Sequence, residues 1–309
     1  MEQKLWDTVI IGGGPAGYSA ALYCVRAGFS TLVVEMLSAG GQMATTTAIE
    51  NYPGFVESVD GFELAMTMQQ QAEKHGSQTL YAQVTAVQLE GPEKLLETTE
   101  GPVRAKTVIL ATGADPRMLG LEQEAQLRGR GVAYCATCDG GFYRGKTVAV
   151  AGGGNSAAED ALTLSKLCSK VYLVHRRDQL SATRSYLEPL QRANNIEFVF
   201  NKQITALEQD QKLTGLRLKD TQTGEESLLE VDGLFVAIGR VPNTWLVKDQ
   251  LELDAQGYIL ADETTRTSLP GVFAIGDVRT KPLRQVVTAV ADGAVASKFV
   301  EEYLALESH

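Results

Sequence analysis

The sequence predicts an α/β fold made of two three-layer domains, the second inserted into the first. One observation is the length of 309 residues, which exceeds a typical single domain. A second is an internal repeat, because the pattern of residues 7–35 returns at residues 147–177 without a gap. Each copy reads as an apolar strand, a glycine-rich turn, an alanine-rich helix and a second apolar strand, which together form a βαβ unit with parallel strands.

The first copy of the repeat carries Gly12-x-Gly14-x-x-Gly17 between its strand and its helix. In that context glycines let the backbone approach a pyrophosphate at the helix N-terminus, as in Rossmann-like dinucleotide-binding units. The second strand ends at Glu35, whose carboxylate can accept hydrogen bonds from an unphosphorylated ribose. An ordinary strand-to-helix turn also contains glycine, but the complete βαβ context favours a site for the adenosine half of FAD or NAD.

The second copy carries Gly152-x-Gly154-x-x-Ala157, and a basic cluster of His175, Arg176 and Arg177 replaces the acidic residue. A 2′-phosphate on the ribose needs positive charge at this place. The alternative is a solvated end of the strand, where arginines are common. Because the cluster directly follows the second strand of a fingerprint unit, we expect this site to bind NADPH in preference to NADH.

Three further apolar runs end in glycine turns and complete the pattern. Residues 108–113 and 234–239 follow the two copies at similar offsets, and residues 272–277 precede an Ala/Val-rich helix that begins at about Val286. The second repeat copy thus interrupts the pattern of the first. The expected boundaries are residues 1–114 and 246–309 for an outer, discontinuous domain and residues 115–245 for the insertion.

Charge and composition limit the classes of partner. The formal net charge is −10, which argues against nucleic acid as a partner, because phosphate binding needs a basic face. No apolar stretch reaches the length of a membrane span, and the N-terminal residues do not have the pattern of a signal peptide. We therefore expect a cytoplasmic protein with no membrane partner and no structural disulfides.

Two of the four cysteines, Cys135 and Cys138, form a Cys-x-x-Cys pair just before the second fingerprint. Such a pair can be half of a zinc site, which needs two further ligands at suitable spacing, or a redox-active dithiol. No second pair exists, and the three histidines are scattered along the chain, so we expect no metal. Two dinucleotide sites in the same chain would supply electrons, which favours a redox dithiol that opens and closes a disulfide.

Asp139 directly follows the pair and precedes two glycines. It can be a plain turn residue, but beside a dithiol a carboxyl group can also move protons during thiol–disulfide exchange, and we favour that role. Cys24 and Cys168 lie among apolar residues of helical patterns, where we expect buried, inert thiols.

Taken together, these residues resemble the low-molecular-weight thioredoxin reductases, a group of FAD-dependent pyridine nucleotide-disulfide oxidoreductases. The resemblance covers essentially the whole chain. The motifs that carry it, in chain order, are Gly12–Gly17, Gly40–Gln42, Glu50–Gly54, Ala111–Ala114, Cys135–Asp139, Gly152–Ser156, His175–Arg177 and Gly276–Asp277 with the following Arg284–Val286 and Ala289.

The resemblance implies that FAD binds the outer domain and NADPH the inserted one. The residues implied for FAD are Gly12, Gly14, Pro15, Ala16, Gly17, Glu35, Gly41, Gln42, Asn51, Ala111, Thr112, Gly113, Gly276, Asp277, Arg284, Gln285 and Val286. Those implied for NADPH are Gly154, Asn155, Ser156, Glu159, His175, Arg176, Arg177, Ile238 and Gly239.

The resemblance also implies a reaction, a partner and a motion. Electrons would pass from NADPH through FAD to the disulfide of Cys135 and Cys138, with Cys138 nearest the flavin and Cys135 attacking thioredoxin. Family members are usually homodimers. Their inserted domain swings between two orientations, which predicts hinges near residues 112–118 and 241–246.

The chain departs from the family pattern at two places. Ser181 stands where the family's basic motif has a further arginine, and Gly141 follows Gly140 where a larger residue is common. Two other functions stay open. A flavin dithiol–disulfide oxidoreductase of the same fold could serve a glutaredoxin-like carrier, a peroxiredoxin system or a small dithiol, and a non-catalytic redox sensor could use the same sites.

Overall fold

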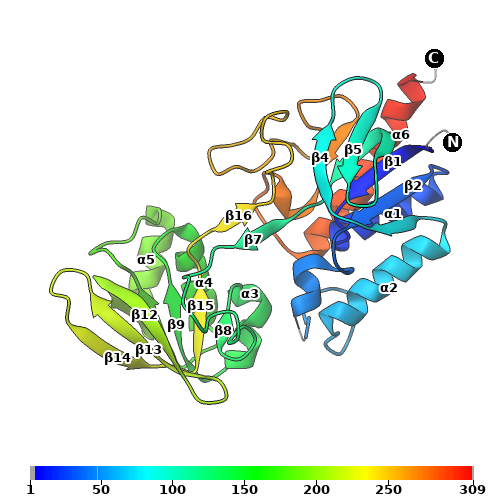
Figure 1. Cartoon of the computed structure of the whole chain (residues 1–309). Coiled ribbons are helices and arrows are strands. Elements are labelled where there is room, and N and C mark those ends of the chain that lie inside the picture. Colours follow the sequence, from blue (N-terminus) through cyan, green and yellow to red (C-terminus); the bar gives the residue numbers. More distant parts are fainter. Residues whose placement is uncertain (1–3, 47, 308–309) are drawn as a thin grey trace. The chain divides into compact units, whose positions relative to one another are not determined.

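The computed structural model describes residues 4–46 and 48–307. The chain forms two compact units (Figure 1). The first contains the residues up to Asp115 and those from Val241 on, and the second contains Pro116–Arg240. The two connections between the units pass through β7 (Ala114–Pro116) and β16 (Arg240–Pro242), which pair as a two-stranded sheet.

The second boundary lies five residues before the one expected from the sequence. Asn243 explains the difference. Its side-chain amide donates hydrogen bonds to the carbonyl of Thr112 at 3.1 Å and to the carboxylate of Asp115 at 3.2 Å. Its backbone N–H donates to the carbonyl of Gly113 at 3.0 Å. These bonds join residues 241–245 to the first unit.

The first unit is built on a seven-stranded sheet with the order β3-β2-β1-β6-β5-β4, in which β17 also pairs with β6. The strands β1, β2, β3, β6 and β17 are parallel, and β4 and β5 form an antiparallel edge. The strands are β1 (Leu5–Ile11), β2 (Thr31–Glu35), β3 (Gln78–Tyr81), β4 (Val84–Gln88), β5 (Lys94–Thr98), β6 (Val103–Leu110) and β17 (Val272–Ala274).

Helices α1 (Pro15–Arg26), α2 (Gly61–Lys74) and α6 (Val286–Glu307) cover one face of this sheet. The opposite face packs against a second apolar cluster that includes residues of β4, β5 and the 246–261 segment. The central strands are buried on both sides, which explains why they read as continuous apolar runs. Short one-turn helices at η1 (Gly41–Thr45) and η3 (Gly276–Val278) lie between the main elements.

The second unit repeats this arrangement. Its five-stranded parallel sheet has the order β11-β10-β9-β15-β8, with an apolar cluster on each face. Helices cover one face, and a three-stranded antiparallel sheet contributes to the other cluster. The elements are β8 (Val132–Ala133), α3 (Ala136–Asp139), η2 (Gly140–Tyr143), β9 (Thr147–Ala151), α4 (Asn155–Ser165), β10 (Lys170–Val174), α5 (Arg184–Arg192), β11 (Ile196–Val199), β12 (Lys202–Gln209), β13 (Leu213–Asp220), β14 (Glu226–Glu230) and β15 (Gly233–Val236).

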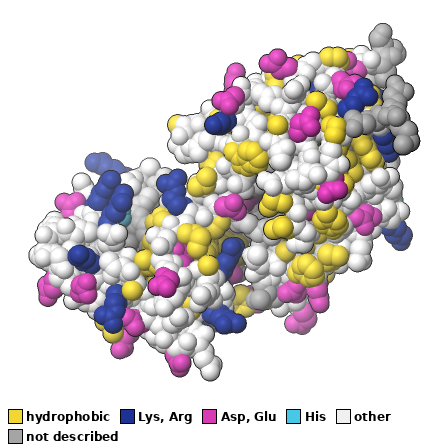
Figure 2. All heavy atoms as spheres, in the orientation of Figure 1, with side chains coloured by type: hydrophobic (Ala, Val, Ile, Leu, Met, Phe, Trp, Pro, Cys, Tyr) yellow, Lys and Arg dark blue, Asp and Glu magenta, His cyan; other side chains and the backbone are white. Residues whose placement is uncertain are grey.

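Both copies of the sequence repeat are therefore βαβ units, β1-α1-β2 and β9-α4-β10, with parallel strand pairs. The prediction of two three-layer, Rossmann-like domains is confirmed. None of the helices in the described ranges is long and apolar enough to cross a lipid bilayer. On the face drawn in Figure 2, basic and acidic side chains are interspersed.

Candidate active site and dinucleotide-binding turns

The first glycine turn fits a pyrophosphate. Gly12 has φ +108°, and a Cβ atom on it would lie 2.4 Å from the carbonyl oxygen of Ala111, so only glycine suits this position. Around Gly14, in contrast, the nearest atom to an added Cβ would be 4.0 Å away. Gly14 caps α1 without a side-chain hydrogen bond, so the first N–H groups of the helix face an open space that can receive an anion.

Glu35 lies at the same turn. One carboxylate oxygen accepts a hydrogen bond from the N–H of Gly13 at 2.6 Å, and the other accepts from Leu37 N–H at 3.2 Å. These bonds hold the carboxylate at the end of β2, beside the glycine turn. That is the position required of a residue that accepts hydrogen bonds from a ribose.

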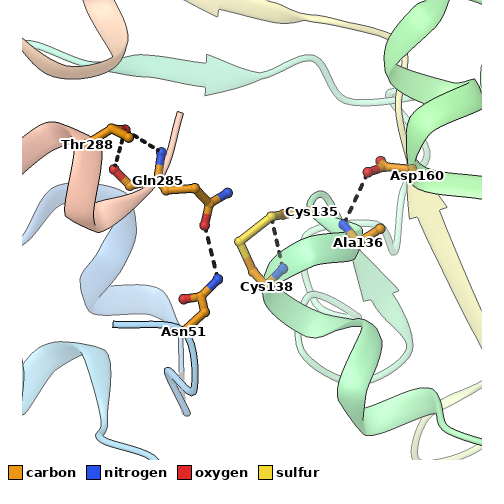
Figure 3. Close-up of a disulfide and its surroundings, with 7 residues drawn as sticks. All are labelled: Asn51, Cys135, Ala136, Cys138, Asp160, Gln285 and Thr288. Carbon is orange, nitrogen blue, oxygen red and sulfur yellow. Dashed lines mark hydrogen bonds between the residues drawn. A yellow bond between two sulfur atoms is a disulfide. The ribbon is translucent and has the colours of Figure 1, made fainter. Parts of the chain in front are cut away.

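Two residues expected at the flavin are in direct contact. Asn51, in a loop, donates a hydrogen bond to the side-chain carbonyl of Gln285 at 3.0 Å (Figure 3). Gln285 immediately precedes α6, and its N–H donates to the hydroxyl of Thr288 at 3.1 Å. Gln42, also expected at this site, donates to the carbonyl of Ala114 and to the carboxylate of Asp115. Each of these contacts joins segments of the first unit that are far apart in the sequence.

The Gly276–Asp277 turn lies in a buried ionic network. Asp292, on α6 and 7% exposed, accepts hydrogen bonds from Gly276 N–H at 2.8 Å, from two nitrogens of Arg279 at 2.9 Å and from Lys281 at 2.8 Å. Arg284, expected as a cofactor residue, donates to the carbonyls of Asp277 and Arg279. The segment expected to bind FAD is therefore fixed to the helix that follows it.

The second glycine turn has an open space beside Gly154, like the one beside Gly14 in the first turn. The nearest atom to an added Cβ on Gly154 is 4.0 Å away, and Gly154 caps α4 without a side-chain hydrogen bond. Arg176 and Arg177 are exposed at the end of β10. His175 instead packs under the turn, where burial and the two neighbouring arginines lower its pKa. At neutral pH the positive charge of the predicted basic cluster therefore comes from the arginines.

The turns after β6 and β15 correspond to each other. Gly113 has φ +71° and Gly239 has φ +103°, a left-handed conformation that glycine adopts without strain. The carbonyl of Gly239 accepts a hydrogen bond from Arg117 N–H at 2.9 Å, within the second unit. Ile238 and Gly239 thus follow the strand next to the second fingerprint, as Thr112 and Gly113 follow β6 in the first unit.

Cys135 and Cys138 form a disulfide at the start of α3. Cys138 N–H donates a hydrogen bond to the sulfur of Cys135 at 3.2 Å (Figure 3). Asp139 N–H donates to the carbonyl of Cys135 at 3.0 Å. Burial raises the pKa of Asp139, and Arg128 partly opposes that shift. A carboxyl group with a raised pKa next to a disulfide holds a proton more readily than an exposed carboxyl group, which suits the proton transfers of thiol–disulfide exchange.

A sequence profile of the pyridine nucleotide-disulphide oxidoreductases matches residues 6–293. A thioredoxin reductase of Mycolicibacterium smegmatis is 47% identical over 305 residues, which cover 98% of each chain. One from Listeria monocytogenes is 42% identical over 98% of this chain and 95% of its own. The solved structure of a thioredoxin reductase from Streptococcus pyogenes aligns over 100% of both chains with a TM-score of 0.92 and 41% identity.

The chain belongs to the thioredoxin reductase family. The resemblance inferred from the sequence motifs is confirmed, and the chain is an oxidoreductase with a disulfide at its Cys-x-x-Cys pair. The relatives named above have nearly the same length as this chain, so the likeness extends over both units.

Two carboxylates that no family motif marked lie near the redox pair. Asp160, on α4, accepts a hydrogen bond from Ala136 N–H at 3.4 Å. Glu124 is fully buried and accepts from the hydroxyl of Tyr134, the residue before Cys135, at 2.9 Å. Asp160 directly follows Glu159 in the helical pattern, and the sequence does not distinguish it as a site residue. Cys24 and Cys168 are buried free thiols, as predicted, with pKa values raised by burial to about 12 and about 11.

The two departures from the family pattern have different structural settings. Ser181 donates hydrogen bonds to the carbonyl of Gly153 from its N–H at 2.7 Å and from its hydroxyl at 3.1 Å, so it lies at the second glycine turn. Gly140 packs against α4, where an added Cβ would lie 3.1 Å from Leu167 and 3.2 Å from Leu164. Gly141 is exposed, and nothing in the structure explains a glycine there.

No cluster of three or more metal-binding side chains occurs within residues 4–46 and 48–307.

Proposed function

We propose that this protein is an NADPH-dependent thioredoxin-disulfide reductase that uses FAD. The observation that carries the proposal is the Cys135–Cys138 disulfide beside the half-buried Asp139, in a chain with two open glycine turns. FAD, when bound, would take a hydride from NADPH and deliver two electrons to this disulfide. The side chains and backbone of the protein would bind both cofactors, exchange the disulfide with the substrate and transfer the protons.

The first unit would hold FAD. The open space at Gly14, the uncapped start of α1 and the carboxylate of Glu35 support this assignment. Asn51 and Gln285 would contact the flavin end, where the N-terminus of α6 favours negative charge. The other residues proposed to surround FAD are Gly12, Pro15, Ala16, Gly17, Gly41, Gln42, Ala111, Thr112, Gly113, Gly276, Asp277, Arg284 and Val286.

The second unit would bind NADPH. Gly154, Asn155 and Ser156 begin α4 and would bind the pyrophosphate through backbone N–H groups. Arg176 and Arg177 would bind the 2′-phosphate. Glu159, His175, Ile238 and Gly239 complete the proposed site.

Reduction of the Cys135–Cys138 disulfide takes two electrons and two protons and gives two thiols. We propose that Cys135 then attacks the disulfide of thioredoxin as a thiolate. The N–H of Cys138 supports this assignment, because it already donates to the Cys135 sulfur and would stabilise negative charge there. Cys138 would next attack the mixed disulfide, which releases reduced thioredoxin and restores the intramolecular disulfide. Asp139 would transfer the protons.

The proposal includes a cytoplasmic homodimer whose inserted unit changes orientation between half-reactions, as the family resemblance implies. The alternative of another disulfide partner, such as a glutaredoxin-like carrier, shares every residue named above. The relatives support thioredoxin as the substrate, because their names specify it.

A turnover assay tests the proposal. FAD-loaded protein is mixed with NADPH, a bacterial thioredoxin and a disulfide dye, and NADPH oxidation is followed at 340 nm. We expect turnover that requires thioredoxin and is abolished in Cys135→Ser and Cys138→Ser variants, with NADH a poor substitute. Flavin reduction by NADPH without thioredoxin-dependent turnover would assign the protein to another disulfide partner.

A further inference from the structure

The helix that supports the redox pair carries a carboxyl group on its packing face. In α4, Ala157, Ala161 and Leu164 are buried, and α3 packs against this helix. Asp160 is three residues after Ala157 and four before Leu164, so it lies on the same face. An apolar residue is the ordinary choice at such a position.

The carboxylate of Asp160 contacts the backbone of the redox motif. It accepts a hydrogen bond from the N–H of Ala136 at 3.4 Å, and Ala136 is bonded directly to Cys135 (Figure 3). At the same helical turn the N–H of Cys138 donates to the Cys135 sulfur. In this turn the N–H of Ala136 therefore donates to a carboxylate, and the N–H of Cys138 donates to the sulfur of Cys135.

The charges around Asp160 leave its carboxyl able to titrate. Burial raises its pKa from 3.8 to about 6, Glu159 on the same helix raises it further, and the Ala136 N–H and Arg240 on β16 lower it. Asp139 on α3 and Glu124, which accepts a hydrogen bond from the Tyr134 hydroxyl, are further acidic groups near the redox pair. Arg128 is the cation that acts on Asp139. Asp160 is thus mostly ionised at neutral pH and mostly protonated below pH 6.

We propose that Asp160 is a positioning residue of the redox pair, whose negative charge opposes thiolate formation at the reduced Cys135. This proposal rests on the redox role given to the pair above. A carboxylate that accepts a hydrogen bond from the residue next to Cys135 favours the protonated thiol there by Coulomb repulsion. When Asp160 takes up a proton in mild acid, the repulsion ends. The pKa of the Cys135 thiol is therefore lower in mild acid, where most thiols are protonated and unreactive.

Alkylation kinetics test the proposal. In FAD-loaded Cys138→Ser protein, Cys135 is the only redox thiol left, and the buried Cys24 and Cys168 react slowly because their pKa values are raised. The rate of iodoacetamide addition to Cys135 is measured by mass spectrometry from pH 5 to pH 10, with and without Asp160→Asn. The amide removes the charge and retains one oxygen that can accept the hydrogen bond from Ala136 N–H.

We expect Asp160→Asn to lower the midpoint of the pH–rate curve by at least about half a unit, which is about three-fold in thiolate fraction at neutral pH. Asp160→Glu should restore the midpoint, and the matched surface variant Glu188→Gln, on the exposed side of α5, should leave it unchanged. If Asp160→Asn does not fold, Asp160→Ser removes the same charge.

An unchanged or raised midpoint in the charge-free variant would overturn the proposal. The readout needs neither NADPH nor thioredoxin, so it is independent of the turnover assay. Failure of turnover with a lowered midpoint would contradict the proposed function and leave the role of Asp160 in place.

Discussion

His175 packs against Gly153 so closely that a Cβ atom added to the glycine would lie 2.2 Å from Cε1 of the imidazole. Nε2 of His175 is buried without a hydrogen-bond partner among the described residues. We therefore predict that Gly153→Ala displaces His175 and the adjoining Arg176 and Arg177. The expected result is a KM for NADPH raised by about ten-fold or more, measured by steady-state kinetics, with little change in flavin content.

A double-mutant cycle separates this steric effect from a general loss of stability. His175→Ala removes the ring that an alanine at position 153 would strike. In the Gly153→Ala background it should recover part of the lost affinity and of the lost melting temperature. Strictly additive effects of the two substitutions would contradict the steric explanation.

The arginines rather than His175 should select the 2′-phosphate. Arg177→Ala is expected to raise KM for NADPH by about ten-fold or more and to leave KM for NADH nearly unchanged. Because burial and the two arginines lower the pKa of His175, no step in NADPH affinity should occur between pH 6.5 and 8. A clear affinity step in that range that disappears in His175→Gln would show that the histidine carries charge.

Burial of Asp160 has a consequence for stability as well as for chemistry. Its pKa is raised from 3.8 to about 6, so the folded state binds the proton more tightly than the unfolded state. The stabilising contribution is complete below pH 4 and is lost as pH rises through 6. Asp160→Asn should therefore be more stable than the unmodified protein at pH 7.5, by at most about 3 kcal/mol, with the difference vanishing near pH 4. Urea unfolding at both pH values measures this difference, and a variant less stable at pH 7.5 would contradict it.

We predict that Asp292 strengthens FAD binding by holding the Gly276–Lys281 segment in place. Asp292→Ala leaves the buried Arg279 and Lys281 without their carboxylate, which typically costs about 3–5 kcal/mol. We expect lower thermal stability and weaker FAD binding, measured by quenching of flavin fluorescence. Glu263→Ala is the control, because Glu263 is exposed and lies 4.0 Å from Arg279. A weakening of FAD binding as large in the control as in Asp292→Ala would refute this role.

The sequence was sufficient to predict the elements that local pattern determines. The two glycine turns, their flanking strands and the start of α6 at Val286 follow from apolar periodicity and glycine spacing. Asp160 and Asp292 could not be recognised, because their partners lie at Ala136 and at Gly276–Lys281, and only the folded chain brings them together. The packing of His175 under the glycine turn could not be predicted either, because the sequence His175-Arg176-Arg177 does not show which side chain points inward.

The proposed function depends on the transfer of electrons from NADPH to the Cys135–Cys138 disulfide. The most direct test is an anaerobic incubation of the FAD-loaded protein with NADPH, followed by alkylation and mass spectrometry of each cysteine. We predict that both Cys135 and Cys138 become alkylated only after NADPH is added, while the buried Cys24 and Cys168 stay unmodified. Reduced flavin with no new alkylation at Cys135 and Cys138 would contradict it.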